Sequence, residues 1–432
     1  MAIAFARAPK RQTPGALFVG DGFGYYIYLP SLIIDRDLDL ANQIAHQPQQ
    51  FEHWTFAPVP ATGKLGNIFQ IGPALLWLPF FVSAHLLVLA LHVVGMRIPQ
   101  NGFGWAYELP VYCASFAYGL VGVAHIYKLL KDLWGERVSA VSTALVVLAS
   151  PVAAYLWFEP DMSHAVSMML IAMLVYHLHR LSSGQSRGLA AWAWIGALCG
   201  FIALVRLPDV IVGVGVAWVG ASTLIGGAGD REGAPPDWAK VLASAAVAAL
   251  VASAIFIPQL LVWKAIYGKA LSMPPNPFYT RIDWSRPDLF NYFFSTYHGL
   301  FSWTPILAAA TAGLLWGAVR GVPVMRWSLV IFCLAAYFNS SIYEWWAGAS
   351  FGERRMVDYA VVFALGLGYL FQRRPAIVSN VSFRIAALAL CAFNWILIFR
   401  YFMKDLPEYG FVSWHDLYAK TLTFPFHILT KL

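Results

Sequence analysis

The sequence is poor in charged residues. Only 12% of its 432 residues are Asp, Glu, Lys or Arg, whereas 59% are apolar. Soluble domains usually carry about 25% charged residues, so the composition argues against a soluble protein. Many apolar runs approach the length of about 20 residues that a membrane-spanning helix needs. The sequence therefore predicts an all-α polytopic membrane protein.

Clustered cysteines and basic stripes are also lacking. The four cysteines stand singly within apolar runs, where a thiol behaves as a small hydrophobe, and they form no disulfide or zinc pattern. The net charge is +7, but Lys and Arg are scattered between apolar runs and form no stripe that could follow nucleic-acid phosphates. The first fifteen residues have no apolar core after their basic residues, so we expect neither a signal peptide nor a membrane helix there.

Ten apolar runs are predicted to form membrane helices in a single domain. We expect residues 1–106 to form an outer loop with interfacial helices, 107–403 a helix bundle and 404–432 a C-terminal tail. An eleventh run, Ile71 to Val94, is less secure because Pro, Ser and His residues interrupt it. The ten runs are Tyr107 to Leu130, Val138 to Phe158, Ala165 to Leu181, Leu189 to Val205, Val210 to Ile225, Val241 to Trp263, Leu300 to Val319, Trp327 to Tyr343, Met356 to Phe371 and Ile385 to Met403.

The loop charges predict an orientation by the positive-inside rule. If Tyr107 starts outside, the loops rich in Lys and Arg all face the cytoplasm, and the polar loops at 159–164, 206–209, 264–299 and 344–355 face outward. The segment 20–42 joins them only if Ile71 to Val94 does not cross the membrane but lies along or dips into the outer leaflet. We then expect a first transmembrane helix before Asp21, and this chain contains none.

Asp21 is the leading catalytic candidate. It lies between Gly20 and Gly22 in GDGFGYYIYLP, where glycine backbone lets a ligand approach closely, and Tyr25 follows in the same stretch. The functional interpretation is a general base or metal ligand, and the alternative is a turn Asp that caps the next helix. Three later acidic residues of this stretch, at 35, 37 and 39, lack the Gly and Glu of a calcium loop and predict a surface turn.

A second charged cluster occurs in WFEPDMSHAVS. Glu159, Asp161 and His164 lie where one helix ends and the next begins. Asp161 or Ser163 fits a helix N-cap, but capping does not account for three ionisable groups at a membrane face, and such groups are functional candidates. Asp161 or Glu159 could be a second catalytic carboxylate beside Asp21.

Arginines in the outer loops are candidate phosphate ligands. Arg206 could either pair with the nearby Asp209 or bind a phosphate. Glu353, Arg354 and Arg355 follow the segment EWWAGASFG, and adjacent arginines on an outer face favour an anion because the guanidinium makes paired charge-assisted hydrogen bonds.

Three further substrate-binding candidates are less specific. Trp346 fits either a sugar-stacking residue or an interfacial aromatic belt. His298 and Lys64 complete the candidate set, although a lone His or Lys in such a position is more often structural.

Several of these segments together resemble the C-type membrane glycosyltransferases, which include protein O-mannosyltransferases and aminoarabinose transferases. They are GDGFGYYIYLPSLIIDRDLDL, GNIFQIGPALLWLPFF, FEPDMSHAVS, HGLFSWTP and WWAGASFGERR. The resemblance implies a carboxylate of the first outer loop as the catalytic group, matched by Asp21, and an acidic residue opening the second outer loop, matched by Asp161. It also implies interfacial helices in the first outer loop and a helix before it.

The implied reaction moves a sugar from a polyprenyl-phosphate carrier to an acceptor outside the membrane, in the bacterial plasma membrane. Some members of this fold use a divalent metal and others do not, and the sequence shows no complete metal site. Two other classes compete with this interpretation. A transporter or lipid flippase predicts mid-membrane charges and paired halves, and the third class is a non-catalytic membrane assembly protein.

Overall fold

Helices form the whole architecture of the computed structural model, which describes residues 17–46, 55–225, 237–272, 274 and 281–429. Within these ranges there is no strand, only two isolated β-bridges, Pro58 with Leu65 and Ile282 with Ile342. The all-α prediction is therefore confirmed.

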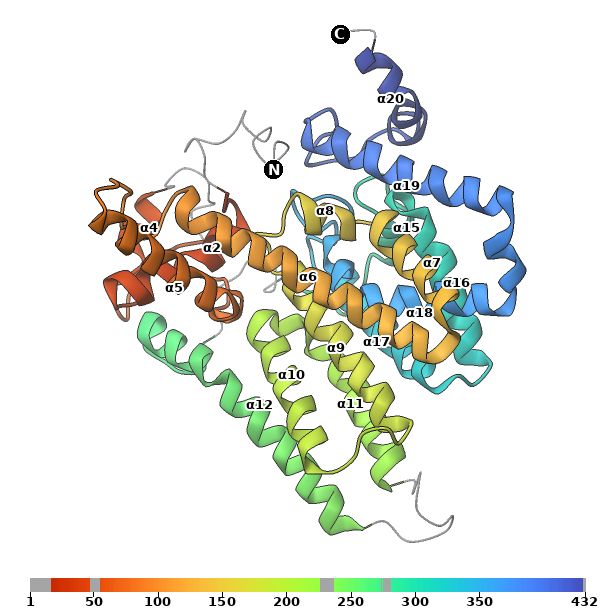
Figure 1. Ribbon diagram of the computed structural model, residues 1–432, viewed down its shortest axis with the longest axis horizontal. Helices are drawn as coiled ribbons and strands as arrows, with labels where there is room; N and C mark the ends of the chain where they lie inside the picture. The colour runs from red at the N-terminus through yellow and green to blue at the C-terminus, as the bar shows by residue number, and fades with distance from the viewer. Residues whose placement is uncertain (1–16, 47–54, 226–236, 273, 275–280, 430–432) are drawn as a thin grey trace.

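The N-terminal part contains four short helical segments followed by one long helix. They lie together at the left of Figure 1 and pack on the start of the bundle through α5 and α6. Their bounds are α2 Asp21–Tyr26, α3 Tyr28–Pro30, η2 Ser31–Asp35, α4 Ala41–Ala45 and α5 Gly72–Val93.

The central part contains the longest helices. In Figure 1, α6 runs diagonally across the molecule, and α9, α10, α11 and α12 extend below it. The bounds are α6 Trp105–Trp134, α7 Glu136–Leu148, α8 Val152–Trp157, α9 His164–Ser182, α10 Leu189–Val205, η3 Leu207–Val212, α11 Gly213–Gly220, η4 Ala221–Ile225 and α12 Trp238–Tyr267.

The C-terminal part packs against α6, α7 and α9. Helices α16 and α18 approach closely at Gly366 of α18 and Ala310 of α16. A Cβ added at Gly366 would lie only 1.8 Å from the carbonyl oxygen of Ala310, so glycine is required there. The bounds are α14 Leu289–Phe294, α15 Leu300–Trp303, α16 Pro305–Val319, α17 Pro323–Ser341, η5 Arg354–Tyr359, α18 Ala360–Arg373, η6 Pro375–Ser379, α19 Val381–Phe402, η7 His415–Ala419 and α20 Lys420–Leu429.

Each predicted apolar run is largely helical, but several runs are divided. The run from Val138 breaks at Pro151 between α7 and α8, and the run from Leu300 breaks before Pro305, because proline cannot continue a helix and fits its first turn. By length and composition, five of the described helices can each cross a membrane: α5, α6, α9, α12 and α19. The other runs are shorter or less apolar.

Helix α5 is continuous over Gly72–Val93 although Pro79 lies inside it. It is as long and apolar as a spanning helix. The expectation that this segment lies along the membrane stays a prediction.

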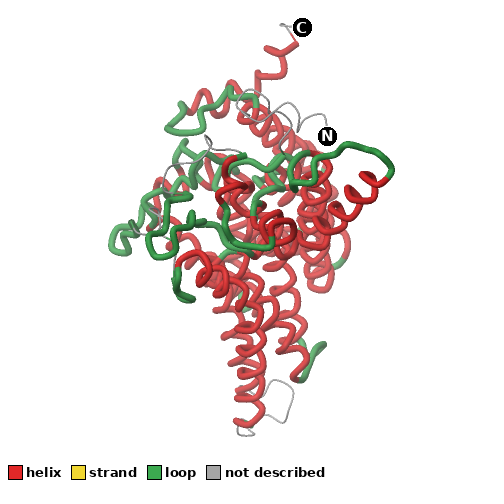
Figure 2. The backbone as a smooth tube through the Cα atoms, turned by 90° about the vertical axis from the view of Figure 1, so that its left-hand side faces the viewer, coloured by secondary structure: helices red, strands yellow, loops and turns green. Residues whose placement is uncertain are grey.

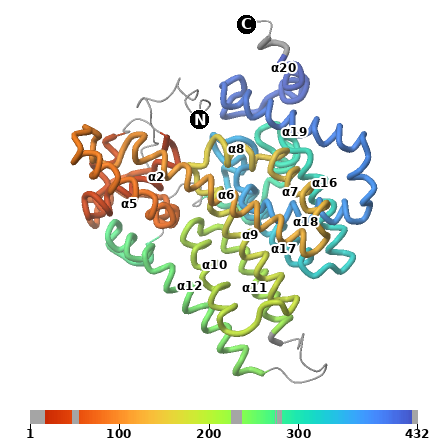
Figure 3. The backbone as a smooth tube through the Cα atoms, in the orientation of Figure 1, coloured from red at the N-terminus to blue at the C-terminus, as the bar shows by residue number. Residues whose placement is uncertain are grey.

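Helix ends and loops gather where the polar residues lie. Helices α9 and α18 begin, and α10 and α17 end, next to segments 159–163, 206–209 and 344–359. Figure 2 shows the loops concentrated in the upper part of the molecule, with α10 and its neighbours extending away from them. The fold therefore brings together polar segments that lie far apart in the sequence, as the colours of Figure 3 show.

Candidate active site

An ion pair joins the two leading site candidates. Oδ2 of Asp21 lies 3.0 Å from Nη1 of Arg354, and the two side chains are 37% and 16% exposed. Asp21 is the first residue of α2, with Gly20 at the N-cap position and no side-chain cap bond. The alternative that Asp21 caps this helix is therefore wrong. The carboxylate is held by a cation and still faces solvent.

Asp161 lies beneath the Asp21 segment. It is 1% exposed, and its Oδ2 accepts a hydrogen bond from the amide of Val19 at 3.4 Å. The backbone of Gly22 packs directly on it, because an added Cβ would lie 2.6 Å from the same oxygen. The structure thus brings the two predicted carboxylates together, but Asp161 is buried against the backbone while Asp21 is accessible.

The turn before α9 connects Asp161 with the arginines. Ser163 occupies the N-cap position of α9 but makes no cap bond. Its hydroxyl donates to the Tyr25 hydroxyl at 3.2 Å and accepts from Nη1 of Arg206 at 3.3 Å. The neighbouring Met162 sulfur lies 3.7 Å from Nη1 of Arg354. The prediction that this turn serves as a cap is wrong, because its side chains bond to the site instead.

Glu159 opens the same turn and is partly buried. Its backbone amide donates to the carbonyl of Ala154, and its charge acts on Tyr155 of α8. It therefore lies at the edge of the cluster, on the side of α8.

Behind this turn lies a buried charge network centred on Asp358. One carboxylate oxygen of Asp358 lies 2.9 Å from Nδ1 of His164, and the other lies 2.9 Å from Nε of Arg206. Asp358 is 0% exposed. Arg206 also lies 3.4 Å from Asp209, so the predicted pairing of these two residues is present but is the longer of its two ion pairs.

The second carboxylate of the network is held by hydroxyl groups. Asp209 accepts hydrogen bonds from Ser167 at 2.5 Å and from Tyr359 at 3.1 Å. The charges of Asp21 and Arg354 act on His164. The network is therefore electrically connected to the ion pair in front of it, although His164 itself is buried.

The other two residues of the ERR motif face inward. Arg355 lies 3.6 Å from the carboxylate of Glu344 and donates to its carbonyl at 2.9 Å. Burial raises the pKa of Glu344, and the charge of Arg355 offsets only part of this rise. The adjacent arginines thus differ, because Arg354 meets Asp21 and Arg355 stabilises the loop.

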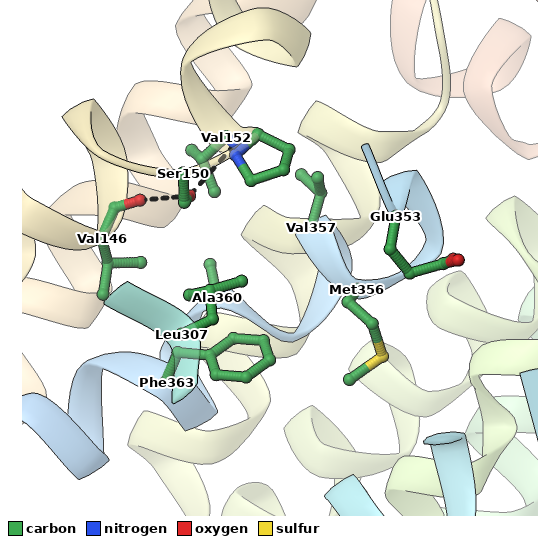
Figure 4. A pocket seen from close by; sticks show the side chains of 10 residues that line it. Val146, Ser150, Val152, Leu307, Glu353, Met356, Val357, Ala360 and Phe363 are labelled. Atoms are coloured by element: carbon green, nitrogen blue, oxygen red, sulfur yellow. Dashed lines mark hydrogen bonds between the residues drawn. The ribbon is translucent and has the colours of Figure 1, made fainter. Parts of the chain in front are cut away.

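Glu353 has the most unusual environment of the predicted residues. It is 1% exposed, and neither carboxylate oxygen has a hydrogen-bond partner within ordinary limits. Burial raises the pKa of Glu353 to about 8, against the lowering effect of Arg355. Figure 4 shows Glu353 at the edge of a small apolar cavity with Met356, Val357 and Phe363. A buried, protonated carboxyl group suits this place better than a phosphate ligand.

His298 and Trp346 contact each other rather than the Asp21 pair. Nδ1 of His298 lies 3.0 Å from the carbonyl oxygen of Trp346, and the Trp346 ring stacks on Tyr297 at 5.1 Å. Burial lowers the pKa of His298 to about 4, so the ring is neutral near pH 7. The positive φ of His298, 58°, marks a tight turn before α15.

Lys64 lies in the turn closed by the Pro58–Leu65 bridge. The neighbouring Thr62 donates to the carbonyl of Ile266 at 2.5 Å, which docks this turn on the end of α12. Among the described residues, no ion pair connects Lys64 with the Asp21 cluster.

Two acidic residues important to the site were missed. Asp358 lies within the predicted run Met356 to Phe371, and Glu108 lies within the run from Tyr107. Glu108 is 3% exposed and accepts from the amides of Gly104 at 3.0 Å and Phe18 at 3.4 Å, so it anchors the chain before Asp21. A carboxylate inside an apolar run was the signal that could have identified both.

No group of three or more His, Cys, Asp and Glu side chains in the described ranges is arranged to hold a metal ion. The site consists instead of carboxylate–guanidinium pairs. Such an arrangement can accept a proton at Asp21 and offer positive charge beside it at Arg354.

Apolar helices with a charged cluster at their loop-rich end define an integral, multi-pass membrane protein with a polar site. Residues 103–263 match the family model described as dolichyl-phosphate-mannose-protein mannosyltransferase. This match supports the predicted resemblance to polytopic membrane glycosyltransferases over that segment. No curated protein sequence matches the chain.

Solved structures that match the chain include an oligosaccharyltransferase and ArnT. The oligosaccharyltransferase AglB from Archaeoglobus fulgidus, in complex with an inhibitory peptide and a dolichol-phosphate, has 11% identity and a TM-score of 0.46, covering 98% of this chain and 53% of that chain. ArnT from Cupriavidus metallidurans has 14% identity and a TM-score of 0.48 in the apo state, covering 99% and 74%. Bound to undecaprenyl phosphate, ArnT has 15% identity and a TM-score of 0.47, with the same coverage.

The chain thus spans about half the length of the oligosaccharyltransferase. With TM-scores below 0.5, these likenesses carry no weight in assigning the function.

Proposed function

We propose that the chain is a membrane glycosyltransferase that moves a sugar from a polyprenyl-phosphate carrier to an acceptor on the outer side of the membrane. The observation that carries this proposal is the ion pair of Asp21 and Arg354. The family match over residues 103–263 supports it, because that family is described by a lipid-phosphate-linked sugar donor.

Asp21 is the proposed general base. Its side chain is 37% exposed, so an acceptor hydroxyl can reach it. As the acceptor oxygen forms a bond to the sugar carbon, its proton passes to the Asp21 carboxylate. The bond from that carbon to the phosphate oxygen breaks, and the carrier phosphate leaves with its electron pair.

Arg354 is the proposed group that stabilises the leaving phosphate. It is the arginine nearest to Asp21, and fixed positive charge where negative charge develops is a strong catalytic term. Arg206 is engaged with Asp358 at 2.9 Å, and Arg355 with Glu344 at 3.6 Å. We therefore assign Arg206 and Arg355 to positioning, together with His164, and keep Arg354 as the phosphate ligand.

Asp161 is proposed to position Asp21 rather than to react. Its contact with Gly22 and the amide of Val19 fixes the backbone on both sides of Asp21. Tyr25, which bonds to Ser163 of the turn before α9, remains a proposed sugar contact together with Glu159 and Trp346.

The apolar helices supply a place for the lipid tail of the donor. Helix α12 is the clearest, since only 6% of its apolar window is buried inside the protein and several of its apolar side chains, such as Leu250 and Leu261, are exposed. The loop charges favour the outer side of the membrane for the site. The bacterial plasma membrane is the proposed location.

The test is transfer of radiolabel from a panel of polyprenyl-phosphate sugars by the purified chain in lipid vesicles. Wild-type protein is expected to move label from one donor to an acceptor, and Arg354→Gln is expected to weaken donor binding at least tenfold, since it removes a charge-assisted contact to phosphate. The matched control is Arg320→Gln, an exposed arginine after α16.

Two results would contradict the proposal. Movement of the intact lipid-linked sugar across the bilayer without covalent transfer would identify a flippase. Donor binding that is unchanged in Arg354→Gln would remove Arg354 from the phosphate site.

A further inference from the structure

An open cavity lies at the other end of α9 from the Asp21 cluster. It has a volume of about 530 Å³, part of which is open to solvent. His177 and Arg180 of α9 line one wall, Trp194 and Ile195 of α10 line the other, and Ser186 lies in the connecting loop. His177 lies thirteen residues after His164, so the cavity is about 20 Å along α9 from the candidate active site.

The lining of this cavity carries one positive charge. Arg180 supplies it, the other lining residues are His177, Ser186, two alanines, Trp194 and Ile195, and none of them is a carboxylate. His125 and Lys128 of α6 also act electrostatically on His177. Asp132 acts on His179, which does not line the cavity. An anion entering the cavity therefore meets the charge of Arg180 with no carboxylate in the lining.

Arg180 is equipped to bind such an anion. Its Nε is buried and makes no hydrogen bond, while its guanidinium lies 5.8 Å from the centre of the Tyr176 ring. A guanidinium held over an aromatic ring keeps its in-plane N–H groups available for oxygen acceptors. A phosphate oxygen in the cavity would bind the terminal nitrogens of this partly exposed guanidinium.

Of the two helix ends at the cavity, the start of α10 favours an anion. The last carbonyls of α9 are already bonded, because the carbonyl of Arg180 accepts from the amides of Gln185 at 2.9 Å and Ser186 at 3.1 Å. The 17-residue helix α10 begins after Gly188 with no side-chain cap, and its first turn, at Ala190 and Ala191, lines the cavity. Uncapped amides at a helix N-terminus attract phosphate.

Trp194 indicates a membrane-facing position. Its side chain is 44% exposed, and its ring lies 6.0 Å from that of His177. Tryptophan is enriched at the level of lipid headgroups, and basic pockets between membrane helices bind anionic headgroups.

We propose that this cavity is a second, non-catalytic site that binds a phosphate group, carried by an anionic lipid headgroup or by a soluble phosphate ion. Arg180 is its main ligand, with Ser186 and the first turn of α10 as further donors. The site is independent of the glycosyltransferase proposal, since neither Arg180 nor His177 contacts the Asp21 cluster.

The test uses native mass spectrometry of the full chain with phosphatidylglycerol, with uncharged diacylglycerol as the lipid lacking phosphate, and separately with inorganic phosphate. Arg180→Gln is compared with Arg187→Gln, which removes an equal charge from the loop that follows α9. Arg187 is exposed and donates to the carbonyl of Gly184 at 3.3 Å, outside the cavity lining. Unchanged melting temperatures show that both variants fold.

We expect Arg180→Gln to weaken phosphatidylglycerol binding roughly fivefold to tenfold and Arg187→Gln to change it less than twofold. If phosphatidylglycerol binding depends on Arg180, the cavity is a lipid-headgroup site. If only the binding of inorganic phosphate depends on Arg180, the cavity is a site for a soluble ion. Equal effects of the two variants, or no effect of Arg180→Gln on either probe, would overturn the proposal. Arg180→Lys, which keeps the charge but loses the planar donors, is expected to restore binding only in part.

Discussion

Replacing Asp358 should destabilise the protein more than any exposed charge change. This carboxylate is fully buried and holds His164 and Arg206, each at 2.9 Å. In Asp358→Asn the side chain keeps its shape but loses its charge, which removes the closer ion pair of Arg206. With the amide oxygen on Arg206, the amide nitrogen faces Nδ1 of His164 in place of a carboxylate oxygen.

The expected cost follows from this geometry. Removing one partner of a buried ion pair typically costs about 3 to 5 kcal/mol. Arg206 retains Asp209 at 3.4 Å and Ser163 at 3.3 Å, so part of its charge stays compensated. We expect about 2 to 3 kcal/mol for Asp358→Asn, near the value for losing hydrogen bonds to a charged group.

The assay is unfolding in mixed detergent micelles, followed by circular dichroism. A double-mutant cycle of Asp358→Asn with Arg206→Gln should give a coupling energy of about 1 to 3 kcal/mol, because the two residues are in direct contact. The matched control is Glu136→Gln, which breaks the exposed pair with Lys131 at 2.6 Å and should have little effect. Stability of Asp358→Asn equal to wild type, or additive effects in the cycle, would refute the reasoning.

Other predictions concern the acidic loop and the Asp21 segment. Glu353 binds its proton up to about pH 8 when folded but only to about pH 4.5 when unfolded. The unfolded state therefore binds fewer protons between these values, and stability should fall as pH rises from 5 to 8, by at most about 1.4 kcal/mol per pH unit. Melting temperatures should fall less steeply for Glu353→Gln, and equal slopes would show that this carboxyl group does not hold a proton. Gly22→Ala should cost about 1 to 3 kcal/mol by overpacking on Asp161 and reduce transfer, whereas Gly213→Ala, which meets nothing within 4 Å, should be neutral in both assays.

The sequence was sufficient to predict the helical architecture because apolar runs and prolines act locally. The runs starting at Leu189 and Ala165 correspond closely to α10 and α9. Hydropathy predicts continuous helices across the prolines at 151 and 305, because hydropathy alone does not locate the point where a helix is interrupted.

The candidate site was predictable only in part. Asp21 and Arg354 were identified from local signals, namely the flanking glycines and the paired arginines. The sequence does not distinguish the roles of Arg354 and Arg355. These adjacent residues of η5 contact different partners, Asp21 and Glu344, which only the tertiary fold brings near them. Asp358 was missed because it was counted as part of an apolar run, although it is the residue that joins His164 and Arg206.

Asp21→Asn is the most direct test of the proposed function. The substitution keeps the size of the side chain and removes its ability to accept a proton, so label transfer from a polyprenyl-phosphate sugar should fall by at least about a hundredfold. The control is Asp39→Asn, an exposed aspartate of the same segment, which should keep full activity. A folded Asp21→Asn protein that transfers sugar at the wild-type rate would contradict the assignment of Asp21 as the base.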